Sequence, residues 1–541
     1  MVRGAAAQAP AHDPNLAEEL TGHDDLILIG EIEVTTRNVY GPEIEQRSFY
    51  GLFNKLHVTS RESFVRQFLW FGPGDQVEAD ELAEVGRRLR ATNLFGEVRV
   101  VRKFNQATER HDLTIVTRDR FSLSLGGSGL FVGGVSGFNG TLGERNLFGT
   151  GNSLTGSYSR NSEGEERASL AFQDRFIGDS WHQLDLSAGT TEEGDVFSVA
   201  VSRPFRSLRD PFTWEVSALT QETAVDFFEG GDTVAEVPRD LTGASLFVAR
   251  GVGPRFRRWT LGVDLRYDDT SFGVASGPDA ARIDIPGDLR QLRLGPFVRY
   301  EATQSFEQVR GIDTTDFLQD IQLGWHTDLF LGAQWRREEH VGEDLEPLVI
   351  GGFRGAIDPF PDTYVTLSST GSVRWNDGQA VGWTALAALH AFQQSLPGQT
   401  LAASLTYDQV FEGENLPVEL NLGEDNGLRG YPAREFVGDR RVRLNLEDRI
   451  RTGIEFGSIH VDLVTFFDTA WIDDGSFGAP LSSVGAGLRF GSSELFGSGV
   501  LRLDFAIPLD ERDGEDFSPS VSLALGQVFS FFGNSSALPG R

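Results

Sequence analysis

The residue types that carry most enzyme chemistry occur in this sequence without the spacing that catalysis needs. The nine His are scattered, and neither a His-Glu-x-x-His zinc helix nor a phosphate-binding Walker loop is present. The stretch Gly134-Val135-Ser136-Gly137 comes nearest to a Gly-x-Ser-x-Gly nucleophile elbow, but Phe138 breaks the pattern. We therefore expect no catalytic residues, no metal and no cofactor, and predict that the protein is not an enzyme. Spacing alone leaves open a small polar triad that forms only on a folded β wall.

Composition narrows the class further. A net charge of -31 argues against nucleic-acid binding, which requires a basic face, and agrees with simple solubility. The absence of cysteine excludes a disulfide framework and a thiolate metal site. No run approaches the roughly 18 consecutive apolar residues of a membrane helix. A closed β-barrel is therefore the membrane structure that the sequence permits.

The N-terminal part predicts a flexible lead and then a small α+β domain. Residues 1–23 are polar and Ala-rich, and the Ala-rich run within residues 5–9 is typical of the end of a secretion signal. Residues 24–120 predict the order β-α-α-β-β. The expected elements are a strand at 27–34, a helix opened by a Thr59–Glu62 capping box and continuing to Leu69, a helix at 79–91, and strands at 95–104 and 112–118.

From Phe121 onward, segments of about ten residues alternate apolar and polar side chains between Gly, Asp, Asn and Ser turns. Clear examples are Trp259–Tyr267 and Leu501–Ile507. Alternation alone does not distinguish a soluble sandwich from a membrane barrel. Roughly 400 residues of it exceed one sandwich, and no blade-length repeat indicates a propeller. The 41 Phe also suit the aromatic girdles of a membrane barrel.

One segment of the N-terminal domain and one near the end of the barrel each resemble a known type of bacterial protein segment. Leu89–Val98, with its Leu-Phe-Gly-Glu-Val strand entry, resembles a POTRA domain, whose sheet edge pairs with extended client segments. A generic small α/β domain is the alternative. Gly526-Gln527-Val528-Phe529-Ser530-Phe531 resembles the ending of bacterial outer-membrane barrels, which the barrel-assembly machinery reads. Ala524 and the ten residues after Phe531 depart from that ending, and an ordinary amphipathic strand is the alternative.

Three further motifs together resemble the Omp85 family over about residues 24–532. They are the Asn-Leu-x-Gly-Thr-Gly hairpin at Asn146–Leu154, the Arg-Gly-aromatic tip at Gly427–Tyr431, and the Phe-x-Asp strand at Phe466–Ala470, where Ala470 replaces the usual Gly. Glu447 matches an acidic position on the strand between the last two. Singly these motifs are weak, but their order downstream of a POTRA-like unit is specific.

The resemblance implies that a long sixth extracellular loop folds into the barrel. We expect Arg429 to bind Asp468 and Glu447 on adjacent strands, because a guanidinium matches carboxylates and Gly430 permits a tight turn. A solvated surface pair is the alternative. The candidate site comprises Leu428, Arg429, Gly430, Tyr431, Glu447, Phe466 and Asp468, and the candidate assembly signal comprises Gly526, Phe529 and Phe531.

The predicted fold is an all-β transmembrane barrel at 121–532, after the POTRA-like domain and before a tail at 533–541. Sixteen antiparallel strands are expected from the family and eighteen are possible, although about fourteen segments can be marked before the long loop. Five strands are expected after it, near 440–452, 457–471, 483–493, 498–510 and 518–530. The first strand, near Phe121–Gly127, is expected to meet the last at a weak seam.

The function implied by the resemblance is protein assembly or translocation at the bacterial outer membrane, with the N-terminal domain in the periplasm. The expected partners are unfolded or exported client proteins, the barrel-assembly machinery and outer-membrane lipids, with no nucleic acid. A passive channel or structural surface protein of the same fold is the alternative from another class. Secretion of one dedicated partner is a third.

Overall fold

The computed structural model describes residues 26–39, 54–55, 57–132, 135–160, 165–312, 318–339, 341–411, 419–457, 459–473, 478–492, 500–510 and 518–529. The predicted lead at 1–23, the tail at 533–541 and Phe531 lie outside these residues. Two compact units meet in sequence between Phe121 and Ser122, and Phe148–Thr150 groups with the first. Among the described residues, no helix is long and apolar enough to cross a membrane.

The first unit contains one four-stranded sheet in the order β2-β1-β4-β3. Strands β1 and β4 pair in parallel, and the other two pairings are antiparallel. Its elements are β1 (Leu26–Arg37), α4 (Glu62–Arg66), β2 (Gln76–Glu78), α5 (Ala79–Ala91), β3 (Phe95–Asn105) and β4 (Arg110–Asp119). The predicted order is present, with the short β2 added between the two helices.

Helix α5 has the predicted bounds and buries Leu82, Val85 and Leu89, as the spacing of its apolar residues indicates. A capping box stabilises its first turn, where the Glu78 backbone N–H donates to Glu81 Oε2 at 3.0 Å. The sequence pattern of this helix therefore agrees with its tertiary packing.

The capping box predicted at Thr59 and Glu62 is wrong. Helix α4 begins at Glu62 after Arg61, whose side chain makes no capping hydrogen bond. The backbone N–H of Ser60 instead donates to Asp119 Oδ2 at 2.6 Å. A carboxylate from β4, distant in sequence, thus holds the segment that the local pattern assigned to a cap.

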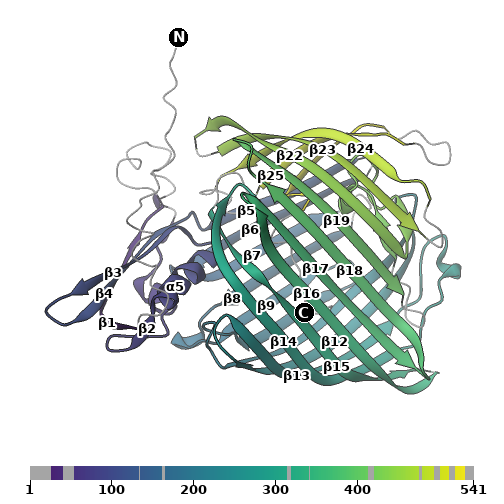
Figure 1. Cartoon of the computed structure of the whole chain (residues 1–541). Helices are drawn as coiled ribbons and strands as arrows, with labels where there is room; N and C mark the ends of the chain where they lie inside the picture. Colours follow the sequence, from purple (N-terminus) through teal and green to yellow (C-terminus); the bar gives the residue numbers. More distant parts are fainter. Residues whose placement is uncertain are drawn as a thin grey trace, which may run out of the picture. The chain divides into compact units, whose positions relative to one another are not determined.

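The second unit is a closed barrel of 20 strands, and every neighbouring pair is antiparallel (Figure 1). The first ten are β5 (Leu123–Val132), β6 (Val135–Leu147), β7 (Asn152–Arg160), β8 (Glu166–Asp174), β9 (Gln183–Thr190), β10 (Asp195–Arg203), β11 (Phe212–Glu229), β12 (Asp232–Val252), β13 (Arg257–Phe272) and β14 (Leu289–Arg310). The other ten are β15 (Leu318–Glu338), β16 (Gly342–Phe360), β17 (Thr363–Asn376), β18 (Gln379–Gln393), β19 (Gln399–Phe411), β22 (Arg440–Phe456), β23 (Ile459–Asp473), β24 (Leu481–Gly491), β25 (Val500–Pro508) and β26 (Ser520–Leu525).

The predicted class, an all-β barrel behind a small α+β domain, is confirmed, but the expected sixteen strands, or eighteen, are wrong. The five strands predicted after the long loop are all present, as β22 to β26. Fifteen strands precede the loop, an odd number, as an extracellular loop requires. The sixteen strands expected from the family would leave eleven before the long loop, and some of the fourteen marked segments would then have to be loop hairpins. The structure instead pairs these segments as strands of the barrel, so the long loop is the eighth on its side and not the sixth.

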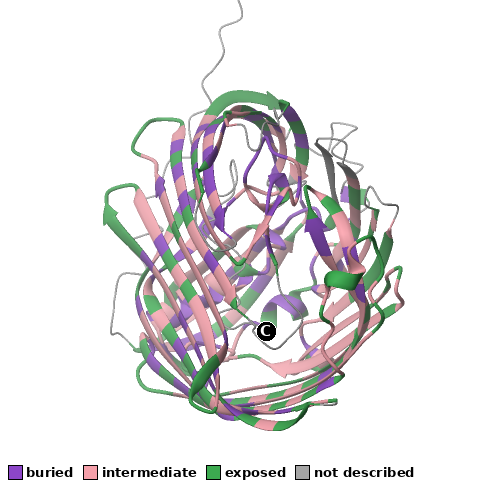
Figure 2. Cartoon of the chain, turned by 90° about the vertical axis from the view of Figure 1, so that its right-hand side faces the viewer, coloured by how far each residue is buried: buried purple, intermediate pink, exposed green. Residues whose placement is uncertain are grey.

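The exposure of side chains along each strand identifies which face meets lipid. On β13, Trp259, Leu261 and Val263 are 47%, 47% and 51% exposed, whereas the intervening Thr260 and Asp264 are buried. Figure 2 shows the same banding of exposed and buried residues along many strands. A soluble sandwich would expose the polar face, so this apolar outer face is that of a membrane barrel.

An aromatic row lies across neighbouring strands of the outer wall. The ring centroids of Trp259 and Tyr300 are 4.7 Å apart, those of Tyr300 and Trp325 are 5.2 Å apart, and those of Trp325 and Phe353 are 6.3 Å apart. The row crosses the four consecutive strands from β13 to β16. Such a row is typical of the aromatic girdle at a membrane interface.

Candidate functional site

The long loop between β19 and β22, described from Glu419 to Asp439, is itself folded. Two short strands, β20 (Leu420–Leu422) and β21 (Phe436–Gly438), pair within it, and the turn η3 (Glu424–Asn426) follows β20. Gly427 and Gly430 adopt φ angles of 91° and 96°, which favour glycine. The residues between these two glycines form the tip of the loop. We call the whole described segment, from Glu419 to Asp439, the Arg429 loop.

Arg429 lies fully buried at this tip and binds two strands of the wall. Its Nε and Nη2 donate to the two carboxylate oxygens of Asp468 at 2.7 and 2.8 Å. Its Nη1 donates to Glu447 Oε1 at 2.9 Å. The guanidinium carbon lies 3.5 Å from the ring centroid of Phe466. The structure therefore brings together the residues that the sequence analysis placed at this site, on β22 and β23.

Three charged residues that sequence reasoning missed complete the cluster. Arg449 Nε donates to Glu447 Oε2 at 2.9 Å. Arg489 Nη1 donates to Asp504 Oδ1 at 2.5 Å, and Asp504 Oδ2 lies 3.6 Å from Arg429 Nη1.

The buried part of the cluster contains three guanidinium groups and three carboxylates, and the 14% exposed side chain of Arg502 adds a fourth guanidinium 3.2 Å from Asp504 Oδ2. The buried members are Arg429, Arg449, Arg489, Glu447, Asp468 and Asp504. Each side chain is at most 7% exposed. Removal of one member of such a buried network leaves an uncompensated charge, at a cost of about 3–5 kcal/mol.

Alternation of apolar and charged residues on β22 and β25 was the available signal for Arg449 and Asp504, and β24 contains Arg489 as its charged residue. Arg502 and Asp504 stand between apolar residues, but alternation does not reveal which charges converge. Register supplies that information, because Arg489 pairs with Arg502 and Gly487 pairs with Asp504.

Glycines on β24 make room for the cluster. A Cβ atom at Gly487 would lie 2.0 Å from Asp504 Oδ1, and one at Gly485 would lie 2.2 Å from Phe466 Cζ. This glycine pair therefore allows Phe466 and Asp504 to pack closely against β24. At the tip itself, a Cβ atom at Gly430 would lie 3.3 Å from the Cβ of Ser483.

The Arg429 loop also packs apolar side chains against the wall. Leu428 and Tyr431 are fully buried on either side of Arg429 and Gly430. They belong to a cluster that consists of Leu422, Leu428, Tyr431, Phe436, Ala470, Ile472 and Leu481. Ala470, which departs from the expected Gly, is therefore a packing residue. The Tyr431 hydroxyl donates to the carbonyl of Ser482 at 2.8 Å.

Backbone groups of the loop are held as well. Asn445 Nδ2 lies 2.7 Å from the carbonyl oxygen of Gly427 and 2.8 Å from Asp468 Oδ1. The N–H of Gly430 donates to Glu424 Oε2 at 2.8 Å. The loop is thus attached through side chains, apolar contacts and its own backbone, and this arrangement can hold it against β22 to β25.

The early Asn-Leu-x-Gly-Thr-Gly motif forms the turn between β6 and β7, as predicted. Leu147 pairs with Asn152 across it. Phe148 and Gly149 have positive φ angles of 54° and 74°, and Asn146 Oδ1 accepts the N–H of Gly151 at 2.8 Å. The motif is therefore a tight turn that its own Asn closes.

The predicted assembly signal is placed differently from expectation. Strand β26 ends at Leu525 and does not continue to residue 530 as predicted. Gly526 has a φ angle of 89°, and Phe529 is buried among side chains of the inner wall. The left-handed turn at Gly526 takes these residues away from the strand, and Phe531 lies outside the described residues.

The barrel closes where β26 meets β5. Among the described residues, Leu523 pairs with Gly129 across this closure. By contrast, β25 and β26 share six paired positions, and β22 and β23 share fourteen. The predicted meeting of the first and last strands is therefore present, with one paired position among the described residues.

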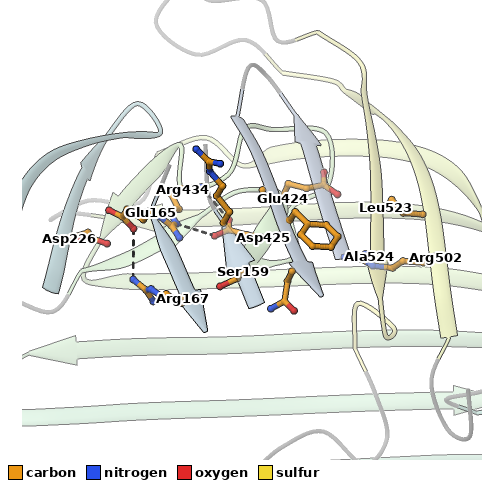
Figure 3. Close-up of a pocket in the computed structure, with 14 residues that line it drawn as sticks. Ser159, Glu165, Arg167, Asp226, Glu424, Asp425, Arg434, Arg502, Leu523 and Ala524 are labelled. Atoms are coloured by element: carbon orange, nitrogen blue, oxygen red, sulfur yellow. Dashed lines mark hydrogen bonds and ion pairs between the residues drawn. The ribbon is translucent and has the colours of Figure 1, made fainter. Parts of the chain in front are cut away.

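A cavity of about 360 Å³ lies beside this seam (Figure 3). Leu523 and Ala524 of β26 line it together with Glu424 of the Arg429 loop. Two ion pairs border the cavity. Arg434 Nε lies 3.6 Å from Asp425 Oδ2, and Arg167 Nη2 lies 3.9 Å from Glu165 Oε2. Its wall combines apolar side chains with charged ones of both signs.

No protein-family model and no curated protein matches the sequence. Among solved structures, the chain is similar to BamA from Haemophilus ducreyi lacking POTRA domains 1-3, with 12% identity and a TM-score of 0.41 over 92% of this chain and 84% of that chain. It is also similar to CdiB from Escherichia coli, with 12% identity and a TM-score of 0.49 over 92% of this chain and 76% of that chain. For CdiB from Acinetobacter baumannii the values are 13% and 0.44 over 93% and 74%. BamA and CdiB are Omp85-type barrels.

Proposed function

We propose that this chain is an Omp85-type protein of the bacterial outer membrane that accepts client polypeptides at its N-terminal domain and at its barrel seam. The observation that carries the proposal is the short pairing of β26 with β5, through Leu523 and Gly129. A strand edge with unpaired backbone groups is a template for another strand. The seam therefore offers a client strand backbone groups for pairing, whereas the longer ladders of the wall use theirs between neighbouring strands.

The N-terminal domain offers a second edge. Strand β3 is eleven residues long, lies at the end of the sheet order, and pairs with β4 among the described residues. An extended segment can add to such an edge by backbone hydrogen bonds, with alternate side chains providing selectivity. We propose that this edge, in the periplasm, receives unfolded or exported clients.

The Arg429 loop supports the proposal by making the wall beside the seam rigid. Its buried cluster connects β22, β23, β24 and β25 through Glu447, Asp468, Arg489 and Asp504. We expect the barrel to open at the pairing of β26 with β5, which this cluster does not bridge. No nucleotide, metal or catalytic step is part of this proposal.

A reversible seam closure tests the proposal, and the natural chain contains no cysteine to interfere. We would combine Leu523→Cys with Gly129→Cys, in cells where this variant is the sole copy, and measure the outer-membrane proteome. Oxidation is expected to deplete client proteins, and a reductant is expected to restore them, since the disulfide removes the free edge. Broad depletion indicates general assembly, and depletion of one or two exported proteins indicates a dedicated transporter.

The matched control is Leu463→Cys with Leu488→Cys, a directly paired position of β23 and β24 that does not include either seam strand. Oxidation of this control is expected to leave the proteome unchanged. If the oxidised seam variant supported the same proteome as the control, the client role would be refuted. A passive channel or structural protein would then become the leading interpretation.

A further inference from the structure

Strands β14 and β15 are 22 and 21 residues long, compared with about 9–11 for a strand that crosses a bilayer, and their hairpin bends at a defined position. The register of the pair shifts between Thr303 and Ser305, which leaves Gln304 as an extra residue opposite Gly324 and Leu323. Gly324 has a φ angle of 130°, and a Cβ atom there would lie 2.1 Å from the carbonyl oxygen of Ala302. A bulge of this kind bends a strand pair and re-aims the residues beyond it.

The end of β14 beyond the bulge contacts strands that are not its neighbours in the wall. Gln394 Nε2 donates to the carbonyl of Arg310 at 2.8 Å, and Thr400 Oγ1 donates to that of Gly311 at 3.1 Å. Arg449 Nη1 donates to the carbonyl of Ile312. Strands β16 and β17 lie between β15 and β18 in the barrel order, so the hairpin reaches over them toward β19 and β22.

These contacts lie on the inner face of the wall. Register places Phe392 opposite Ala402, and Ala402 opposite Glu447, so all three side chains share the face that bears the buried charge cluster. The hairpin and these strands enclose one apolar cluster. Its members are Val309, Ile312, Ile321, Leu323, Ala356, Phe392, Ala402 and Phe529.

The C-terminal segment Gly526–Phe529 is held within this cluster. The ring of Phe529 stacks on that of His390 with centroids 5.9 Å apart, and lies 6.0 Å from that of Phe392. Arg449 Nη2 donates to the Phe529 carbonyl at 3.2 Å. Arg489 Nε donates to Gln527 Oε1 at 3.2 Å. The segment thus has a built site, with apolar walls and two buried guanidinium donors.

The same segment has an alternative partner. Antiparallel partners change by one residue in opposite directions along a ladder. Continuation of the register from Leu523 and Gly129 would therefore set Val528 opposite Ser124 and Phe529 opposite Leu123. Leu123 is the first residue of β5, so Phe529 would complete the seam to the start of that strand.

We propose that the β14–β15 hairpin, β18, β19 and β22 form an intramolecular binding site for the segment Gly526–Phe529, and that release of this segment extends β26 along β5. Occupation of the site keeps the seam short, and release completes it. The two guanidinium donors also bind Glu447 and Asp504, which hold Arg429. The Arg429 loop and the end of the last strand therefore depend on the same charged groups.

Crosslinking of paired cysteines tests this proposal on the purified full-length protein, which has no native cysteine. The test pair is Val528→Cys with Ser124→Cys, which approach each other only if β26 extends. The reference pair is Leu523→Cys with Gly129→Cys, which reports that the barrel is folded and the seam formed. Each pair is made in the natural background and with Arg449→Gln. The control is Glu455→Gln, because Glu455 lies on the same strand and its side chain is 59% exposed.

The reference pair is expected to crosslink in every background. The test pair is expected to crosslink weakly in the natural background and with Glu455→Gln, and several-fold more with Arg449→Gln. Equal crosslinking of both pairs in the natural background would overturn the proposal, since the segment would not be held. Weak crosslinking of the test pair with Arg449→Gln, while the reference pair still forms, would also overturn it. Neither result depends on whether the protein handles clients.

Discussion

The wall around the Arg429 loop and the seam between β26 and β5 are parts of one barrel with opposite constructions. Strands β22 and β23 share fourteen paired positions, and a network of buried ion pairs binds the loop to that wall. At the seam, Leu523 and Gly129 are the described pair that joins the last strand to the first. Closure of a barrel therefore does not make all of its ladders equal. The distribution of contacts predicts which part opens, and three measurements can test that difference.

Arg429→Glu is expected to have the largest effect. The substitution sets a carboxylate against Glu447 and Asp468 where a guanidinium now binds both. Loss of one partner of a buried ion pair costs about 3–5 kcal/mol, and the added repulsion increases that cost. We expect poor assembly, and a lower unfolding midpoint in urea for the protein that does assemble.

Arg434→Glu is the matched control for this substitution. Arg434 belongs to the same loop, but its side chain is 41% exposed and its ion pair with Asp425 spans 3.6 Å. An exposed pair of this kind contributes about 0–1 kcal/mol. If Arg429→Glu assembled and unfolded like the control, the buried cluster would not be what holds the loop.

Gly485→Ala is expected to have an intermediate effect, because it adds a methyl group where the Phe466 ring and the carbonyl oxygen of Phe505 both lie 2.2 Å away. Phe466 would have to leave the face of the Arg429 guanidinium. Overpacking typically costs about 1–3 kcal/mol. Chemical denaturation of the purified barrel would measure the change. Gly478→Ala is the control, since nothing lies within 4 Å of an added Cβ there, and equal midpoints for the two variants would contradict the packing argument.

Hydrogen exchange compares the two regions without altering either. Backbone amides of β26 (Ser520–Leu525) are expected to exchange before those of β24 (Leu481–Gly491), which is paired along its length on both sides. A rate ratio of about tenfold or more corresponds to an opening free energy lower by about 1.4 kcal/mol. Mass spectrometry of peptic fragments would resolve the two strands. Equal protection would show that the seam is as stable as the wall.

Local sequence patterns were sufficient for several elements. The bounds of α5 (Ala79–Ala91) follow from its apolar spacing and from the turn before it, both of which are local properties. The strands after the Arg429 loop were predicted because alternation and turn residues recur over short distances. Arg429, Glu447 and Asp468 were identified through the resemblance of their short motifs to the Omp85 family, and the structure shows the contacts that the resemblance implied.

Tertiary structure decided the features that depend on register and closure. The number of strands depends on which segments pair, and a weak alternation of about ten residues does not distinguish a wall strand from a loop hairpin. Arg449, Arg489 and Asp504 join the cluster because pairing across β22 to β25 aims them at one point. The inward turn of Phe529 was also beyond local reading. The local sequence around Phe529 resembles a strand, but an apolar site built by β14, β15 and β18 holds the Phe529 ring. Those strands are more than a hundred residues away in sequence.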